Sequence, residues 1–177
     1  MYDYRGFPEE AYQYTIPNQG DPELAKRISM LIKNRQIPGI DVKLEKRRGY
    51  DHGVFVPLLL ARVRGSVPVL QVSLVNATDT DTHLMMGEAL APLRKEGVLL
   101  VGSGMTYHNL KYFFQLDKSK AIEHATDFNA NLNALIECNR IEKWHEHHFA
   151  KMCHPTAEHF FPLLVIAGSN RVKKGKV

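Results

Sequence analysis

The pattern of apolar positions along the chain predicts four helices. Residues 21–36 show the start signals most clearly, with Asp21 as a candidate N-cap and Pro22 at the first helical position. Residues 120–148 carry apolar residues at the intervals that place them on one helical face, and residues 157–169 are very apolar. The helices expected are 21–36, 83–97, 120–148 and 157–169, with Gly97 and Gly168 as the stops of the second and fourth.

Two further segments have apolar residues without any charge, which is the pattern of strands buried on both faces. They are residues 66–75 and residues 98–101, and the predicted helix 83–97 lies between them. A strand, a helix and a second strand in this order predict a βαβ unit and a mostly parallel sheet with helices on its faces. Ligands of such sheets gather beyond the carboxyl ends of the strands, so His108 in the Gly-rich "GSGMTYHNL" is well placed for function.

Length and composition indicate an ordinary globular protein. The chain has 177 residues, of which 44% are hydrophobic and 24% charged, with no internal repeat and no Gly/Ser/Pro linker. We therefore expect one domain with its own core. No apolar run approaches the roughly 20 residues that a membrane span needs, and the first ten residues lack the apolar core of a secretory signal. These patterns favour a cytoplasmic protein without a membrane partner.

Charge and cysteine content add two negative expectations. The net charge of +4 comes partly from the basic runs "KLEKRR" and "RVKKGKV". Neither run is interleaved with aromatic residues that could stack on bases, so we interpret both as solvated charge and expect no nucleic-acid partner. The two cysteines are too few for a disulfide scaffold.

Histidines are crowded near the C-terminus, where five of the nine lie within residues 144–161. His145, His147 and His148 stand at the end of the predicted long helix, where imidazole interacts favourably with the negative helix terminus. We interpret them as a solvated helix end, although His145 and His148 have the spacing of two residues on one helical face and could share a metal. The remaining ordinary histidines are His83 and His124, expected on helix surfaces, and His154, expected in a turn before Pro155.

His52, His108 and His159 differ from the others because each lies where a loop meets an apolar segment. A buried imidazole in such a place needs a partner. The pattern alone leaves two interpretations open, a site shared by the three residues or three separate core histidines with their own hydrogen bonds.

These three histidines lie in sequence blocks that resemble the class III extradiol ring-cleavage dioxygenases of the subunit-B-like family. Within that family the blocks are most similar to the DOPA 4,5-dioxygenase-like branch. Five blocks spread over nearly the whole chain carry the resemblance: "YDYRGFPEEAYQYTIPNQGDPELA", "GYDHGVFVPLL", "PVLQVSL", "GEALAPLRKEGVLLVGSGMTYHNL" and "HPTAEHFFPLLVIAG".

The resemblance implies an α/β fold, a three-layer α/β/α sandwich around a mostly parallel or mixed central sheet. It also implies an aromatic ring-opening dioxygenase that inserts O2 into a catechol-type substrate at a non-haem Fe(II), with Zn(II) as another metal that such sites hold. The expected partners are therefore a small catechol and O2, and the resemblance leaves room for a homo-oligomer.

The same resemblance assigns roles to individual residues. His108 and His159 match histidines at the metal centre, and His52 matches a histidine that moves protons between the substrate and its surroundings. Glu158 does not align well with the ligating carboxylate of other branches. Tyr50 and Tyr107 are candidate substrate-binding residues, with an ordinary place in an aromatic core as the alternative for each.

The family pattern extends past both ends of this chain. Members carry an earlier segment with a His-Gly-Ser-Pro turn and a strand ending in Ser-Ala-His, each supplying a metal histidine, and a last strand after the block that ends "VIAG". We thus expect residues 1–177 to form a single domain of the family that is incomplete at its N-terminus and C-terminus. The alternatives to catalysis are a truncated non-catalytic paralogue that acts as a metal-binding or interaction module and, more weakly, a zinc hydrolase, which the absence of His-Glu-x-x-His disfavours.

Overall fold

The computed structural model of the protein divides into two compact units, which are described separately. Unit 1 comprises Met1–Asn34 and Gly39–Ser73, and unit 2 comprises Arg35–Pro38 and Leu74–Val177. The structure describes residue 3 and residues 5–75, 79–115 and 118–171.

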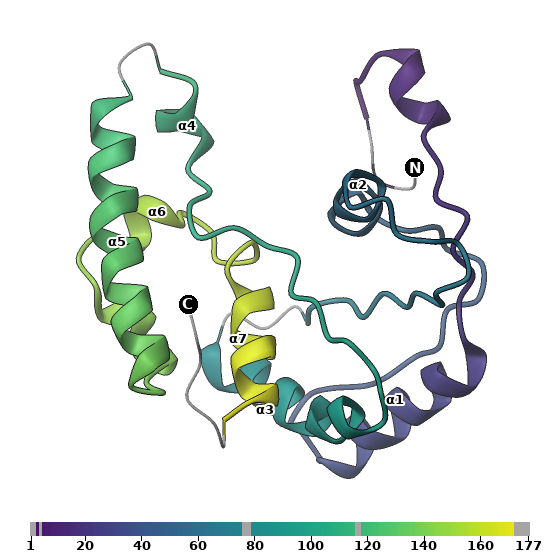
Figure 1. Ribbon diagram of the computed structural model, residues 1–177. Helices are drawn as coiled ribbons and strands as arrows, with labels where there is room; N and C mark the ends of the chain where they lie inside the picture. The colour runs from purple at the N-terminus through teal and green to yellow at the C-terminus, as the bar shows by residue number, and fades with distance from the viewer. Residues whose placement is uncertain (1–2, 4, 76–78, 116–117, 172–177) are drawn as a thin grey trace. The chain divides into compact units, whose positions relative to one another are not determined.

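The described residues of unit 1 form two α-helices and one short 3-10 helix, and Figure 1 labels the two α-helices. They are η1 (Glu9–Gln13), α1 (Pro22–Asn34) and α2 (His52–Leu60). The Asp21 carboxylate accepts hydrogen bonds from the backbone N–H groups of Glu23 and Leu24, both at 3.0 Å, so the predicted N-cap of α1 is confirmed. Among the described residues of this unit, the buried apolar side chains are those of Ile32 and Phe55. Unit 1 therefore has only a small apolar core.

Unit 2 holds the larger core. Its elements are α3 (Thr80–Leu90), η2 (Ala91–Lys95), α4 (Leu110–Phe113), α5 (Ser119–Glu137), η3 (Ile141–Glu146), α6 (Ala150–Cys153) and α7 (Phe161–Ser169). α3 is capped by Asp79, whose carboxylate accepts from the Thr82 N–H at 2.7 Å. The buried side chains that pack together come from five of these elements and from the residue before α7: Leu84, Phe128, Leu132, Ile141, Trp144, Ala150, Cys153, Phe160, Phe161 and Leu164.

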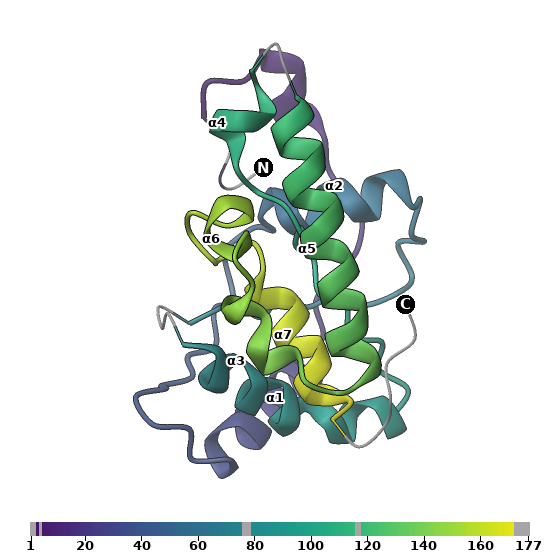
Figure 2. The ribbon, with the colours of Figure 1, turned by 90° about the vertical axis from the view of Figure 1, so that its left-hand side faces the viewer.

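Helices α3 and α7 lie against each other at the centre of unit 2 (Figures 1 and 2). Two glycines make this close approach possible. A Cβ atom on Gly87 would lie 2.0 Å from the carbonyl oxygen of Val165, and one on Gly168 would lie 2.1 Å from that of Leu84. The prediction that Gly168 stops the last helix is therefore wrong. Gly168 lies inside α7, where it allows backbone contact with α3.

The predicted α/β sandwich is also wrong, because none of the described residues forms a β-strand. Residues 66–75 and 98–101 contain no helix, but a strand also needs a ladder of backbone hydrogen bonds to a neighbour. The backbone N–H groups of Val67, Val69 and Val98 instead donate to oxygens in turns, loops and a helix end, as in the bond from Val69 N–H to the Gln19 oxygen. Their apolar side chains are not buried on both faces either, since Leu99 is 85% exposed and Val101 68% exposed. The described part of the protein is helical.

The predicted long helix 120–148 breaks after Glu137. Asn139 adopts a positive φ of 56°, a conformation that asparagine tolerates better than most residues, and its side-chain amide donates to the Arg171 oxygen at 2.8 Å. The chain then turns into the separate helix η3. His145, His147 and His148 consequently do not stand at the end of one long helix.

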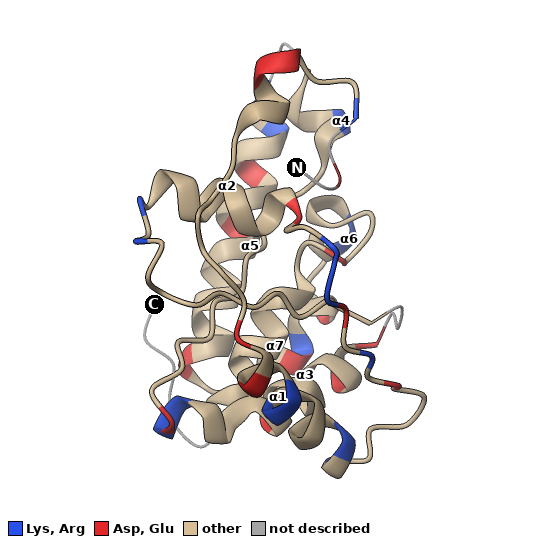
Figure 3. Ribbon diagram, turned by 90° about the vertical axis from the view of Figure 1, so that its right-hand side faces the viewer, with Lys and Arg blue, Asp and Glu red and all other residues tan. Residues whose placement is uncertain are grey.

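Charged residues of both signs are interspersed along the chain (Figure 3). In the basic run "KLEKRR", Lys43 lies 3.9 Å from Asp41 and Arg48 lies 2.6 Å from Asp51. Acidic neighbours thus offset part of its charge. No helix in the part of the chain that the structure describes combines the length and the apolar character needed to cross a bilayer.

Candidate metal centre

The Gly-rich segment before His108 lies directly against the segment that carries His159. A Cβ atom on Gly104 would lie 2.4 Å from the carbonyl oxygen of His159, and one on Gly102 would lie 2.7 Å from that of Pro162. Real Cβ atoms essentially never approach that closely, so both positions need glycine. The "GSG" motif therefore brings the two histidine-bearing segments together.

Backbone and side-chain hydrogen bonds hold these segments in place. The Met105 N–H donates to the His159 oxygen at 2.8 Å, and the His108 N–H donates to the Cys153 oxygen at 2.8 Å. The Asn109 side-chain amide donates to the Met152 oxygen at 2.7 Å. The last two bonds use carbonyl groups at the end of α6, which have no partner within that helix. The end of a short helix thus anchors the loop that carries His108.

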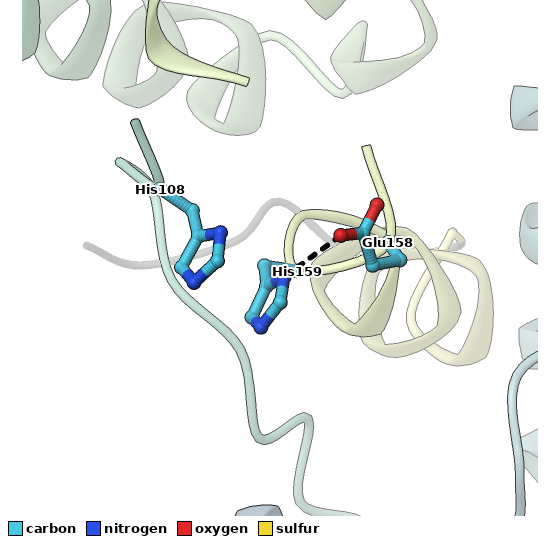
Figure 4. A group of neighbouring side chains, drawn as sticks. All are labelled: His108, Glu158 and His159. Atoms are coloured by element: carbon cyan, nitrogen blue, oxygen red, sulfur yellow. Dashed lines mark hydrogen bonds and ion pairs between the residues drawn. The ribbon is translucent and has the colours of Figure 1, made fainter. Parts of the chain in front are cut away.

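Three potential ligands converge where the two segments meet. The imidazole rings of His108 and His159 stack with centroids 3.4 Å apart and planes 11° apart. Nδ1 of His159 lies 3.3 Å from Oε1 of Glu158, which also accepts a hydrogen bond from the Thr156 hydroxyl at 2.8 Å. Figure 4 shows the two rings face to face with the carboxylate beside His159. One potential ligand atom from each of His108, Glu158 and His159 lies within 4.8 Å of the others.

The surroundings of His108 and Glu158 favour the protonation states that metal binding needs. Burial lowers the pKa of His108, the nearby His159 lowers it further, and Glu158 opposes both effects. Burial alone would raise the pKa of Glu158, but the hydrogen bond from Thr156 and the proximity of His159 lower it overall. At neutral pH His108 is therefore a neutral imidazole and Glu158 a carboxylate, the forms that bind cations.

His52 lies at the start of α2 in unit 1, where it contacts Asp3. The backbone N–H of His52 donates to Oδ1 of Asp3 at 2.9 Å, and Nδ1 of its ring lies 2.5 Å from Oδ2. Burial would raise the pKa of Asp3, but the hydrogen bonds and charge of His52 lower it overall. Asp3 is therefore ionised at neutral pH and fixes the orientation of the His52 ring.

The two tyrosines proposed for substrate binding have different surroundings. In unit 1 the Tyr50 hydroxyl donates to the Val69 oxygen at 2.7 Å. In unit 2 the ring of Tyr107 packs against the core, and its buried hydroxyl has no hydrogen-bond partner among the described residues. Burial raises the pKa of both hydroxyls. Their role in substrate binding stays a prediction.

A second group of three potential ligands lies elsewhere in unit 2. Oδ2 of Asp127 on α5 lies 3.7 Å from Nε2 of His147 and 3.4 Å from Nε2 of His148. However, Nδ1 of His147 accepts a hydrogen bond from the Phe149 N–H at 3.2 Å, which places the ring proton of the neutral form on Nε2. A metal-binding histidine normally shows the opposite arrangement, with its other nitrogen donating. We interpret this group as a polar link between α5 and the turn after η3.

Two histidines expected on helix surfaces, His83 and His124, are in fact buried, and so is His154, which lies outside the helices as expected. His83 is fully buried on α3 and stacks on Phe161, with ring centroids 4.1 Å apart. His124 is 9% exposed on α5 and His154 is 3% exposed. The charged neighbours of His83 and His124 in the sequence suggested exposure, but each helix turns these two side chains toward its packed face. Glu158, which aligns poorly with the ligating carboxylate of other family branches, nevertheless lies beside both histidines, and its position next to His159 is the signal that the sequence offers.

Comparison with known proteins identifies the family. The whole chain, residues 1–177, matches the family model described as the catalytic LigB subunit of aromatic ring-opening dioxygenase. The protein belongs to this family of class III extradiol dioxygenases, and the resemblance seen in the five sequence blocks is confirmed.

Individual relatives support the same assignment. The chain is 35% identical to the 4,5-DOPA dioxygenase extradiol of Beta vulgaris, covering 96% of this chain and 63% of that protein. It is 34% identical to the dioxygenase tasH of Hapsidospora irregularis, covering 96% of this chain and 56% of that protein. A crystal structure of an uncharacterized protein from Escherichia coli K12 superposes with a TM-score of 0.75 at 32% identity, covering 89% of this chain and 66% of the other. The chain thus spans less than two thirds of the length of the curated relatives that it matches.

Proposed function

We propose that this chain carries metal-binding and proton-transfer residues of an extradiol dioxygenase that opens a catechol-type ring with O2. The observation that carries the proposal is the convergence of His108, His159 and Glu158. Several relatives are named as 4,5-DOPA dioxygenases, which supports a catechol such as DOPA as the substrate class. A zinc hydrolase is disfavoured, because the chain belongs to a family of ring-opening dioxygenases.

The donor set fits a non-haem iron. Two imidazoles with one carboxylate form the ligand set typical of Fe(II) oxygenases that keep open coordination positions for substrate and O2. Zn(II) accepts the same ligand types, so the metal can be exchanged in binding experiments. A bound Fe(II) would supply the redox chemistry that joins O2 to the aromatic ring.

The residues around the proposed centre have separate tasks. His108 and His159 are the proposed ligands, and Glu158 completes the donor set. In the metal-free chain Nδ1–H of His159 donates to the Glu158 carboxylate, so a metal held by His159 and Glu158 together would replace this proton, and the ring would carry its proton on Nε2 instead. The stacked arrangement brings both rings to one place on the protein before any metal binds, and the rings must tilt for both lone pairs to point at one ion, because a metal lies in the plane of each imidazole that binds it.

His52 is the proposed acid and base. Its Nδ1–H donates to Asp3, so the lone pair of the neutral ring is on Nε2 and can take a phenolic proton from a catechol. The ionised Asp3 stabilises the imidazolium that results. His52 can then return the proton to the ring-opened product.

Metal content separates the ligand role from the acid/base role. His108→Ala and His159→Ala should each weaken Fe(II) or Zn(II) binding about tenfold or more, because each removes a ligand. His52→Ala should retain the metal and slow turnover by a factor of about 100 to 10,000, the usual contribution of a general acid or base. The measurements are metal content after dialysis and O2 consumption with a catechol. His145→Ala is the matched control, since His145 is exposed and belongs to neither ligand group.

Two results would contradict the proposal. If all three variants lose metal equally, the division of roles is wrong. If the Fe(II)-loaded, anaerobically prepared chain binds metal but neither consumes O2 nor forms a yellow ring-opened semialdehyde with any catechol, the chain is a metal-binding module and not an active dioxygenase.

A further inference from the structure

His154 lies between the two segments that bring His108 and His159 together, and no role in the site has been assigned to it so far. Nε2 of its ring is 2.9 Å from the carbonyl oxygen of Thr106, two residues before His108. The ring also packs against Phe160, the residue after His159, with centroids 5.2 Å apart. The side chain is 3% exposed. One buried imidazole thus contacts both histidine-bearing segments.

The bond from His154 belongs to a series of contacts that runs along the two segments. Met105 bonds to His159, Thr106 to His154, His108 to Cys153 and Asn109 to Met152. Residue numbers rise along the first segment as they fall along the second, so the two segments run antiparallel. The bond from His154 to the Thr106 oxygen is made by a side chain, so a substitution can remove it. In the series it lies between the backbone bond to the His159 oxygen and the backbone bond from the His108 N–H.

The chemical environment determines the form of His154. Because its partner is a carbonyl oxygen, Nε2 must carry the proton and donate it. Nδ1 is then an acceptor, and it is buried without a hydrogen-bond partner among the described residues. Protonating Nδ1 would place an unpaired N–H and a charge in the core, and burial accordingly lowers the pKa of His154 to about 4. His154 therefore remains a neutral donor across the physiological pH range.

We propose that His154 is a positioning residue that sets the spacing of His108 and His159 by tying the Thr106 carbonyl to the core beside Phe160. One of the two tests of this inference, the affinity for Zn(II), rests on the proposed metal-binding function. The other test uses the two stacked rings without metal. Removing the donor should leave the fold in place, because the backbone bonds and the aromatic packing remain, but should loosen the loop before His108.

The experiment compares three substitutions in the full 177-residue chain. His154→Phe keeps a ring in the core and removes the donor. His154→Gln retains a donor near the position of Nε2, whereas His154→Asn is polar but too short to reach the Thr106 oxygen. His83→Phe is the matched control, because it also removes a buried imidazole bonded to a backbone carbonyl, that of Asp79 on its own helix.

The first readout is the proton NMR spectrum of the His108 and His159 rings in the metal-free protein, assigned with His108→Ala and His159→Ala. Stacked rings shift each other's resonances, and these shifts should shrink in His154→Phe and His154→Asn but persist in His154→Gln and in the control. The second readout is affinity for Zn(II) measured by competition with a chelator. It should fall about 10- to 100-fold in the same two variants, the usual effect of removing a group that orients a metal ligand.

Unchanged ring shifts and unchanged affinity in His154→Phe would overturn the inference. If far-UV circular dichroism shows that His154→Phe does not fold, the test is the comparison of His154→Gln with His154→Asn. Equal ring shifts and equal Zn(II) affinity in these two variants would also overturn the inference. If the wild-type chain binds no metal while the ring shifts still depend on the donor at position 154, the proposed metal-binding function fails and the positioning role stands.

Discussion

At the scale of single residues, the buried His154 of unit 2 makes stability depend on pH. His154 has a pKa of about 4 in the folded protein, and an unfolded histidine titrates near 6.5. Between these values the unfolded chain binds more protons than the folded chain. The free energy of unfolding should therefore be fully retained above about pH 6.5 and should fall as the pH drops toward 4.

The effect of His154 can be isolated by substitution. The shift corresponds to an upper bound of about 3 kcal/mol lost between the two pH values. Urea unfolding at pH 7, 5.5 and 4 should show a smaller loss for His154→Gln than for the wild type, because glutamine does not titrate. Parallel loss in both proteins would mean that other groups cause the acid sensitivity.

Single-residue roles were only partly accessible to the sequence. His108 and His159 could be selected because each stands where a loop meets an apolar segment, and the structure places their rings in contact. Glu158 is marked in the sequence only by its position beside His159, whereas its closeness to His108 and the bond from His154 to Thr106 join residues about 50 positions apart that no local pattern connects. Whether His52 acts together with them stays a prediction.

At the scale of secondary structure, the α3–α7 pair depends on its two glycines. Alanine at Gly87 would gain about 1 kcal/mol from its higher helix propensity. However, its Cβ would lie 2.0 Å from the Val165 oxygen, a backbone atom that cannot move without displacing α7. Overpacking of this kind costs about 1–3 kcal/mol or more, so we expect Gly87→Ala to be destabilising despite the gain in propensity.

Thermal unfolding provides the measurement. Gly87→Ala and Gly168→Ala should each lower Tm by several degrees. Gly20→Ala is the control, because the nearest atom to its Cβ would be the Leu70 side chain at an ordinary 3.6 Å. A Gly87→Ala variant as stable as the Gly20→Ala control would show that the two helices can separate without loss.

Elements with local start signals were predicted well, and elements that depend on distant partners were not. Asp21 and Pro22 determine the start of α1 through groups within three residues, so the sequence contains the whole signal. Apolar residues in 98–101 predict extended backbone equally well with or without a neighbouring strand. Only the hydrogen bonds of the folded chain distinguish the two cases, and here the described residues provide no ladder.

At the scale of the whole molecule, the two units differ in how much apolar surface they bury. Unit 1 has two buried apolar residues among those described, whereas unit 2 contains a cluster of ten. We expect unit 1 to unfold at lower denaturant concentration, because local stability follows buried apolar contacts. A single two-state transition is then not expected.

The single tryptophan allows this expectation to be tested. Trp144 is 7% exposed in the core of unit 2, so its fluorescence reports on that unit, whereas far-UV circular dichroism reports on the helices of both. The two signals should give different midpoints in urea. Phe55→Ala should lower the free energy of unfolding of unit 1, and Leu164→Ala that of unit 2, each by about 2–5 kcal/mol. Coincident midpoints that both variants move together would indicate one cooperative unit.

Family membership was the feature of the whole molecule that the sequence predicted best. Five separated blocks carried it, and a match over residues 1–177 confirms it. The architecture was inferred from the same resemblance, and that inference was wrong for the described residues. A family resemblance records which residues are retained, and it does not record which backbone groups of this particular chain find a partner.

The contact between Gly104 and the His159 carbonyl has a consequence for inherited variation. Every amino acid other than glycine has a Cβ atom, and at position 104 that atom would lie 2.4 Å from the His159 oxygen. Any missense change in codon 104 therefore acts on His159, fifty-five residues away, although the histidine codon itself is intact. In a catalogue of natural variants, damage to this glycine should be classed with damage to the histidine that it touches.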